Sequence, residues 1–140
     1  MLRALLVILA LLAAPATRAE TLSDADRAEF QRIISEQIQA FRADDGAKAY
    51  GYAAPSLHQI FPTADIFMQM VKRGYQPVYR PQSFRFGETG NDPLGRPSQR
   101  VTLVGPDGKT YEALYSMQRQ PDGTWLISGC TLIEVPGLDA

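Results

Sequence analysis

Apolar residues recur every three or four positions between Leu22 and Ala43. Spacing of this kind places side chains on one face of an α-helix, so this segment is predicted to be a long amphipathic helix. Ser23 is the expected N-cap, and the turn Asp44-Asp45-Gly46 is expected to end the helix. The apolar stripe consists of Phe30, Ile33, Ile34, Ile38 and Phe41.

Shorter helical segments follow. One runs from Ala47 to Ala54 and stops before Pro55, and Ser56 is placed to cap one further turn. Thr63 is the expected N-cap of the next helix, which Gly74 is expected to end by adopting a left-handed backbone conformation. The apolar stripe of that helix consists of Ile66, Phe67, Met70 and Val71.

After Gly74 the pattern changes from a helical period to alternation. Strands are predicted over residues 83–88, 99–104, 110–119 and 124–134. Two Pro-Asp-Gly turns predict hairpins between the last three strands, because proline presets the first turn dihedral and glycine accepts a positive φ. The chain is therefore expected to place helices first and an antiparallel sheet second.

Other parts of this second half have less regular patterns. Pro77 and Pro81 flank residues 78–80, which predicts an extended segment along a sheet edge, since proline cannot donate a ladder hydrogen bond. Residues 90–97 contain three turn formers and predict a mobile loop. The last strand is apolar on both faces, which predicts a central position with both faces covered.

The first nineteen residues have the three parts of a secretory signal peptide. Arg3 supplies the positive charge, an apolar run follows, and small residues predict cleavage after Ala19, with Ala16 as the alternative site. The uncharged stretch from Ala4 to Thr17 would span about 21 Å as a helix, short of the roughly 30 Å hydrocarbon core of a bilayer. We therefore expect a periplasmic or secreted protein that meets the membrane only through its signal peptide, with residues 20–140 forming one domain.

Composition narrows the range of partners. Fourteen Lys and Arg against fifteen Asp and Glu give a formal charge of -1, which argues against binding to nucleic acid. The one histidine and one cysteine cannot form a disulfide framework or the four-ligand shell of a structural zinc site. No phosphate-binding glycine loop or G-x-S-x-G elbow occurs, so neither a metal nor a cofactor is predicted.

Helices followed by an antiparallel sheet predict an α+β domain, in which the N-terminal helices pack on one face of a curved sheet. This order resembles the NTF2-like fold, the nuclear-transport-factor-2 and SnoaL type of cone, which commonly leaves a pocket between helices and sheet. The segments FRADDGAKAY (41–50), YAAPS (52–56) and GCTL (129–132) are similar to a small exported bacterial family, domain of unknown function 4864. The resemblance spans roughly residues 22–135 and implies no activity or catalytic residue.

His58 is the first candidate for acid–base chemistry, because it is the only side chain here that ordinarily titrates near neutral pH. No catalytic motif surrounds it, so a histidine on the surface of a helical turn is the favoured interpretation. Asp44 and Asp45 are favoured as a turn over an acid pair, since Gly46 follows them. Cys130 is favoured as a buried packing thiol over a nucleophile, because no thiolate-stabilising motif lies nearby.

Aromatic residues are the candidates for ligand binding. A tyrosine or tryptophan combines a large apolar area with one polar atom, which suits burial and orientation of a ligand in a pocket. Ordinary packing is the competing interpretation for each of them. The candidates are Tyr50, Tyr79, Tyr115 and Trp125.

Three functions remain open from the sequence. The first is a non-enzymatic binding or accessory module that takes a small apolar or amphipathic ligand, or a protein segment, into the cone. The second is an NTF2-like isomerase, dehydratase or hydrolase that uses His58 as its base. The third is a homodimer formed through the outer face of the sheet, for which the two-sided apolar strand 124–134 is the reason.

Overall fold

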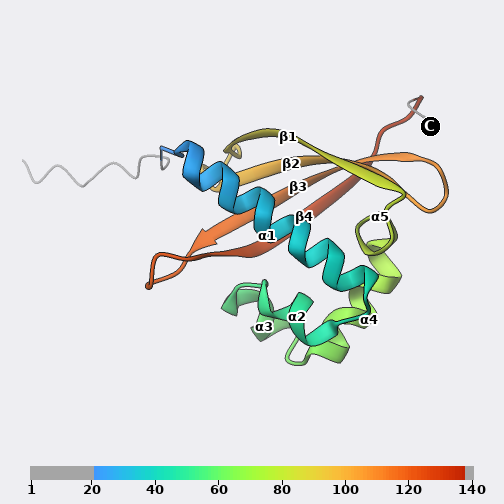
Figure 1. Ribbon diagram of the computed structural model, residues 1–140, viewed down its shortest axis with the longest axis horizontal. Coiled ribbons are helices and arrows are strands. Elements are labelled where there is room, and N and C mark those ends of the chain that lie inside the picture. The colour runs from blue at the N-terminus through green and yellow to red at the C-terminus, as the bar shows by residue number, and fades with distance from the viewer. Residues whose placement is uncertain (1–20, 138–140) are drawn as a thin grey trace, which may run out of the picture.

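The computed structural model describes residues 21–137, in which five helices precede a four-stranded antiparallel sheet. Figure 1 shows the twisted sheet with α1 lying along it and the shorter helices on the same side. The predicted α+β arrangement is thereby confirmed, whereas the predicted signal peptide lies outside the described residues. The elements are α1 (Asp24–Arg42), α2 (Gly46–Gly51), α3 (Pro55–Ile60), α4 (Ala64–Gly74), α5 (Gln76–Tyr79), β1 (Ser83–Asn91), β2 (Pro97–Val104), β3 (Thr110–Arg119) and β4 (Trp125–Glu134).

Helix α1 begins at the predicted N-cap, Ser23. The Ser23 hydroxyl accepts a hydrogen bond from the backbone N–H of Asp26 at 3.1 Å, and the Asp26 carboxylate accepts one from the Ser23 N–H at 2.9 Å. This capping box satisfies two donors that the helix leaves unpaired. The predicted stripe is buried, with Phe30, Ile34 and Ile38 fully inaccessible. Burying each such side chain contributes about 1.5–3 kcal/mol, so the stripe stabilises α1 more than its cap does.

The strands follow chain order, β1-β2-β3-β4, and every neighbouring pair is antiparallel. The last two hairpins turn where predicted, at Gly108 and Gly123, whose φ angles are 77° and 87°. Residues with a Cβ atom rarely adopt such angles, so glycine is needed there. Asp107 and Asp122 support the turns by each accepting a backbone N–H two residues further on, at 3.0 Å.

Two β-bulges bend the sheet. In β1, Gly87 and Glu88 together face one residue of β2. In β4, Ser128 is an extra residue between those paired with Met117 and Ser116 of β3. An extra residue in one strand increases the local twist and bends that strand, which curves the sheet around the helices.

The prediction that the last strand is central is wrong, because β4 is an edge strand. The bulge at Ser128 explains why its sequence looks apolar on both faces. The extra residue shifts the alternation, so Trp125 and Ile127 pack into the core before the bulge, and Cys130 and Leu132 pack against it afterwards. Most of the apolar residues of β4 that the sequence divides between two faces of the sheet therefore lie on the core face alone. This weakens the reason for expecting a dimer through the outer face of the sheet.

The prediction of an extended edge segment around residues 78–80 is also wrong. Residues 76–79 form the short helix α5, with Pro77 in its first turn. Proline is accepted there because its missing N–H would have no helical partner at that position. Arg80 follows α5, donates to the Phe41 carbonyl at the end of α1 and lies 2.9 Å from the Asp44 carboxylate. This contact ties α5 to the end of α1.

Three smaller predictions differ from the structure. Ser56 does not cap a helix but lies within α3, whose N-cap is Ala54. Residues 90–97 form a short turn between strands, because β1 continues to Asn91 and β2 starts at Pro97. The Asp92 carboxylate holds this turn by accepting two backbone N–H groups, each at 2.9 Å. Gly74, at the end of α4, does not adopt the predicted left-handed conformation. A positive φ, of 53°, occurs instead at Asp44, just after α1. A short polar side chain that bonds locally makes this conformation tolerable for aspartate.

Candidate functional site

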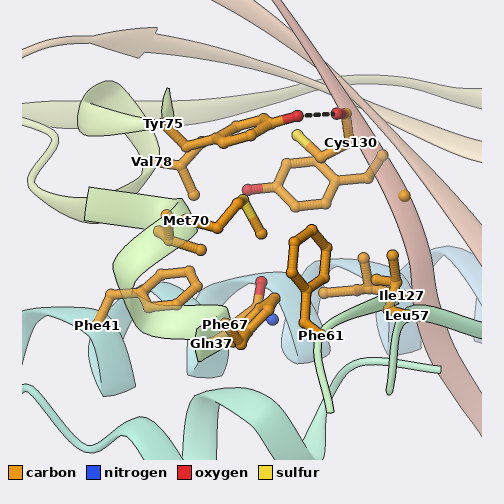
Figure 2. Close-up of a pocket in the computed structure, with 13 residues that line it drawn as sticks. Gln37, Phe41, Leu57, Phe61, Phe67, Met70, Tyr75, Val78, Ile127 and Cys130 are labelled. Carbon is orange, nitrogen blue, oxygen red and sulfur yellow. Dashed lines mark hydrogen bonds between the residues drawn. The ribbon is translucent and has the colours of Figure 1, made fainter. Parts of the chain in front are cut away.

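A pocket lies between the helices and the edge strand β4, and we call it the α4–β4 pocket (Figure 2). Its volume is about 110 Å³, and none of the described residues that line it carries a charge. Leu57, Phe61 and Met70 on its wall are only half-buried, so the pocket is partly open to solvent. An apolar concavity with few polar groups is typical of small-molecule sites.

The helical wall is built mainly from aromatic side chains. Thr63 caps α4, as predicted, by accepting from the backbone N–H of Ile66 at 3.1 Å. This start directs Phe67 of the predicted stripe into the core, where its ring lies 6.1 Å from that of Phe41 and 6.2 Å from that of Phe61. These three rings line the helical side of the pocket, with Phe41 far from β4 and Phe61 beside Ile127 of that strand (Figure 2).

Hydrogen bonds to the edge of β4 hold the two walls together. The Ile127 N–H donates to the Tyr52 carbonyl at 2.8 Å, and the Ile127 carbonyl accepts from the Ala54 N–H at 2.7 Å. Figure 2 shows a third contact, in which the Tyr75 hydroxyl donates to the Cys130 carbonyl at 3.1 Å. The chain between α2 and α3 and the start of α5 are thereby attached to the strand on either side of the pocket.

The polar groups of the pocket are uncharged. Tyr115 is 1% exposed, and its hydroxyl has no hydrogen-bond partner among the described residues. Burial raises the pKa of Tyr115 well above its usual value, and the nearby Cys130 raises it further. Burial likewise raises the pKa of the Cys130 thiol to about 12, although the Tyr115 hydroxyl partly offsets that rise. Both groups are therefore protonated and neutral near pH 7.

The four aromatic candidates are not gathered at one site. Tyr115 lines the α4–β4 pocket, whereas Tyr50, Tyr79 and Trp125 are not part of its wall. Tyr50 instead stacks on His58, with ring centroids 3.8 Å apart and planes 10° apart. Its hydroxyl donates to the Phe61 carbonyl at 2.6 Å, which fixes the end of α3 beside the pocket.

His58 lies on the short helix α3, outside the wall of the α4–β4 pocket. Its Nε2 atom is 2.9 Å from the Tyr50 carbonyl oxygen. Because a carbonyl can only accept, Nε2 carries the proton, and the ring is held against Tyr50 by this bond together with stacking. These contacts give His58 a local role in joining α2 to α3.

Tyr79 lies where α5 meets the end of α1. Its hydroxyl donates to the Asp44 carboxylate, and the Arg80 guanidinium lies 4.0 Å from the centre of its ring. The Tyr79 hydroxyl, followed by the positive charges of Arg80 and Lys72, holds the pKa of Asp44 below its usual value. Asp45 caps α2 by accepting from the Lys48 N–H at 3.1 Å, so the two aspartates serve separate turns.

Trp125 packs beneath the first half of α1. Its ring meets that of Phe30 edge-on with centroids 4.8 Å apart, and its indole N–H donates to the Asp26 carboxylate at 3.3 Å. The guanidinium of Arg119, on the neighbouring strand β3, lies 4.3 Å from the centre of the indole ring. Trp125 thus joins the start of α1 to the start of β4.

Comparison with protein families finds a match over residues 23–140 to the family described as a domain of unknown function (DUF4864). The chain belongs to the DUF4864 family. No curated protein and no solved structure matches it.

Most residues that line the pocket of this DUF4864 domain are not among those that the sequence suggests as ligand-binding residues. Phe67 and Met70 were expected as an apolar stripe, and the structure leaves part of that stripe uncovered at the pocket. Gln37 was missed because it falls within the apolar face of α1, where it is 4% exposed. A polar residue at a buried helical position is the signal that could have identified it.

Within residues 21–137 of the DUF4864 domain, no group of three or more His, Cys, Asp or Glu side chains could hold a metal ion. No helix in the same range is both long enough and apolar enough to cross a bilayer.

Proposed function

We propose that this protein is an exported, non-enzymatic binding module that takes a small apolar or amphipathic molecule into the α4–β4 pocket of an NTF2-like cone. The observation that carries the proposal is the pocket itself, an uncharged cavity of about 110 Å³ with aromatic walls and a half-buried rim. A packed core ordinarily leaves few voids larger than a water molecule, so an opening of this size is suited to a ligand.

The pocket wall favours binding over catalysis, because it lacks the side chains that a catalytic site would need. His58 is stacked on Tyr50 and lies outside the pocket wall. Cys130 lines the pocket, but its raised pKa keeps it in the thiol form, which is a poor nucleophile. A general base and an activated nucleophile are therefore both missing from the described wall.

Benzene is a suitable probe for the proposal, because an engineered apolar cavity of about 150 Å³ binds it. We expect benzene at ten times its Kd to stabilise the protein by about 1.4 kcal/mol, which raises Tm by about 5 °C. The measurement is a thermal melt followed by circular dichroism at increasing benzene concentration.

Two variants on α3 make this test specific. In Leu57→Trp, the larger ring is expected to fill the rim of the pocket and reduce the benzene-induced shift to below 1 °C. Gln59→Trp adds the same ring at an exposed position of the same helix and should leave the shift unchanged. An equal loss of the shift in both variants contradicts the proposal. So does the absence of a shift in the unmodified chain with both benzene and its hydroxylated analogue phenol.

Export is tested by expressing the full chain in a Gram-negative bacterium. We expect the periplasmic fraction to contain a chain that begins at Glu20, as determined by intact mass and N-terminal sequencing. Ala19→Arg places a large charged residue at the cleavage position and should prevent processing, whereas a product that begins at Thr17 indicates the alternative site. A chain that retains Met1 and stays in the cytoplasm contradicts export.

A further inference from the structure

The Tyr115 hydroxyl is an exception to the usual pairing of buried polar groups. The residue is 1% exposed, lines the α4–β4 pocket and has no hydrogen-bond partner for its hydroxyl among the described residues. The neighbouring Cys130 thiol is only a weak hydrogen-bonding group and cannot replace a nitrogen or oxygen partner. Buried hydroxyls are nearly always paired, so one that is unpaired at the wall of a pocket points to a missing partner.

Gln37 supplies a second polar atom from the helical side. Its Nε2 donates to the Ala49 carbonyl at 3.1 Å, which fixes the orientation of the amide because a carbonyl can only accept. Figure 2 shows the amide oxygen on the side of Gln37 that faces the cavity. The pocket therefore offers a hydroxyl from β3 and an acceptor oxygen from α1, set in otherwise apolar walls.

The charge of the walls limits what this partner can be. Among the described residues that line the pocket, none is Asp, Glu, Lys, Arg or His. A carboxylate or an ammonium group would lose its hydration there without gaining a counter-ion, which strongly disfavours binding of the charged form. A pure hydrocarbon would bind without that penalty, but it would leave the Tyr115 hydroxyl unpaired.

We infer that the natural occupant of the α4–β4 pocket is a neutral molecule about as large as a single six-membered ring, carrying one hydroxyl or carbonyl group that forms a hydrogen bond with the Tyr115 hydroxyl. This inference rests on the proposed function and specifies the chemistry of its ligand. The volume of about 110 Å³ limits the occupant to one such ring at most, since a cavity of about 150 Å³ accepts benzene, and the half-buried rim leaves room for its edge.

The test compares three probes of similar size by isothermal titration calorimetry: phenol, benzene and benzoate. At pH 7 we expect phenol to bind about tenfold more tightly than benzene, because one hydrogen bond to a buried hydroxyl is worth about this factor. Benzoate carries a full negative charge at this pH and should bind at least tenfold more weakly than phenol. Equal affinities for phenol and benzene overturn the hydrogen bond, and benzoate binding as tightly as phenol overturns the requirement for neutrality.

Tyr115→Phe removes only the hydroxyl. Because that group is unpaired in the free protein, the variant should fold with undiminished stability. We expect the preference for phenol over benzene to fall from about tenfold to below threefold, while the Kd for benzene stays within a factor of two.

Tyr111→Phe is the matched control, since Tyr111 lies on the same strand and its hydroxyl donates to Asp107 at 2.6 Å, outside the pocket. Its preference for phenol should equal that of the unmodified chain. A Tyr115→Phe variant that keeps the tenfold preference overturns this inference and leaves the proposed function intact. Failure of both benzene and phenol to bind the unmodified chain overturns the proposed function together with the inference.

Discussion

Replacing Trp125 by alanine is expected to lower the free energy of unfolding by about 3–5 kcal/mol, the usual cost of truncating a buried tryptophan. Trp125 is 3% exposed and packs edge-on against Phe30, which is fully buried in α1. Truncation would leave a cavity at this junction and remove the donor that pairs with the Asp26 carboxylate. The loss should be measured by urea unfolding followed by far-ultraviolet circular dichroism, because the variant lacks the only tryptophan of the chain.

Two comparisons separate packing from other effects of this substitution. Trp125→Phe keeps most of the apolar contact and loses the indole N–H, so we expect a smaller loss of about 1–2 kcal/mol. Leu94→Ala changes a side chain in a residue that is 77% exposed, and it should leave stability within about 0.5 kcal/mol. A loss below 1 kcal/mol in Trp125→Ala would contradict the packing of α1 on β4. In the folded variant, the Kd for benzene should change by less than a factor of three, since Trp125 is not part of the pocket wall.

The elements that could be predicted from the sequence are those fixed by contacts close in the chain. Ser23 and Thr63 cap their helices by accepting from backbone N–H groups three residues away, and both caps follow from residue type and spacing. The two Pro-Asp-Gly turns depend on four consecutive residues, so the hairpins could be placed as well. Local chemistry of this kind requires no knowledge of the tertiary structure.

A local sequence pattern predicts the wrong element where that pattern is compatible with two different structures. Proline is excluded from a central strand, but it is also favoured in the first turn of a helix, and Pro77 takes the second solution in α5. Alternation in β4 changes at Ser128 because one extra residue is inserted there. The sequence shows apolar residues before and after the bulge, but the position of the bulge depends on pairing with β3.

The candidate site is harder to predict than the fold, because a pocket forms where side chains of the apolar faces are left uncovered by neighbouring elements. Tyr115 was proposed from its chemistry, and that chemistry is equally present in Tyr79, which instead binds Asp44 at the end of α1. Phe67 and Met70 belong to a stripe that any core helix would carry. Contacts between residues far apart in the chain, such as that of Tyr75 with Cys130, decide which part of the stripe remains uncovered.

Alkylation of Cys130 by iodoacetamide at pH 8 is expected to be about a thousandfold slower in the native protein than in the unfolded chain. The thiolate is the reactive form, and burial raises the pKa of this thiol from about 9 to about 12, which reduces the thiolate fraction by nearly that factor. Intact mass gives the rate directly, because the chain has one cysteine and every adduct therefore reports on it. The unfolded reference is the same chain in guanidinium chloride.

The dependence of this reaction on pH separates a raised pKa from simple steric protection. With a pKa of about 12, the native rate should still rise tenfold per unit between pH 8 and 10, whereas the unfolded rate should begin to level near pH 9. The native state also binds the thiol proton more tightly than the unfolded chain, so this contribution to stability is complete below pH 9 and is lost as the pH rises toward 12.

Benzene or phenol in the α4–β4 pocket should slow the alkylation of Cys130 further, since Cys130 lies on the pocket wall. A native rate within tenfold of the unfolded rate would mean that the thiol is accessible and ionised, and the pocket would then need to be considered as a site of thiol chemistry.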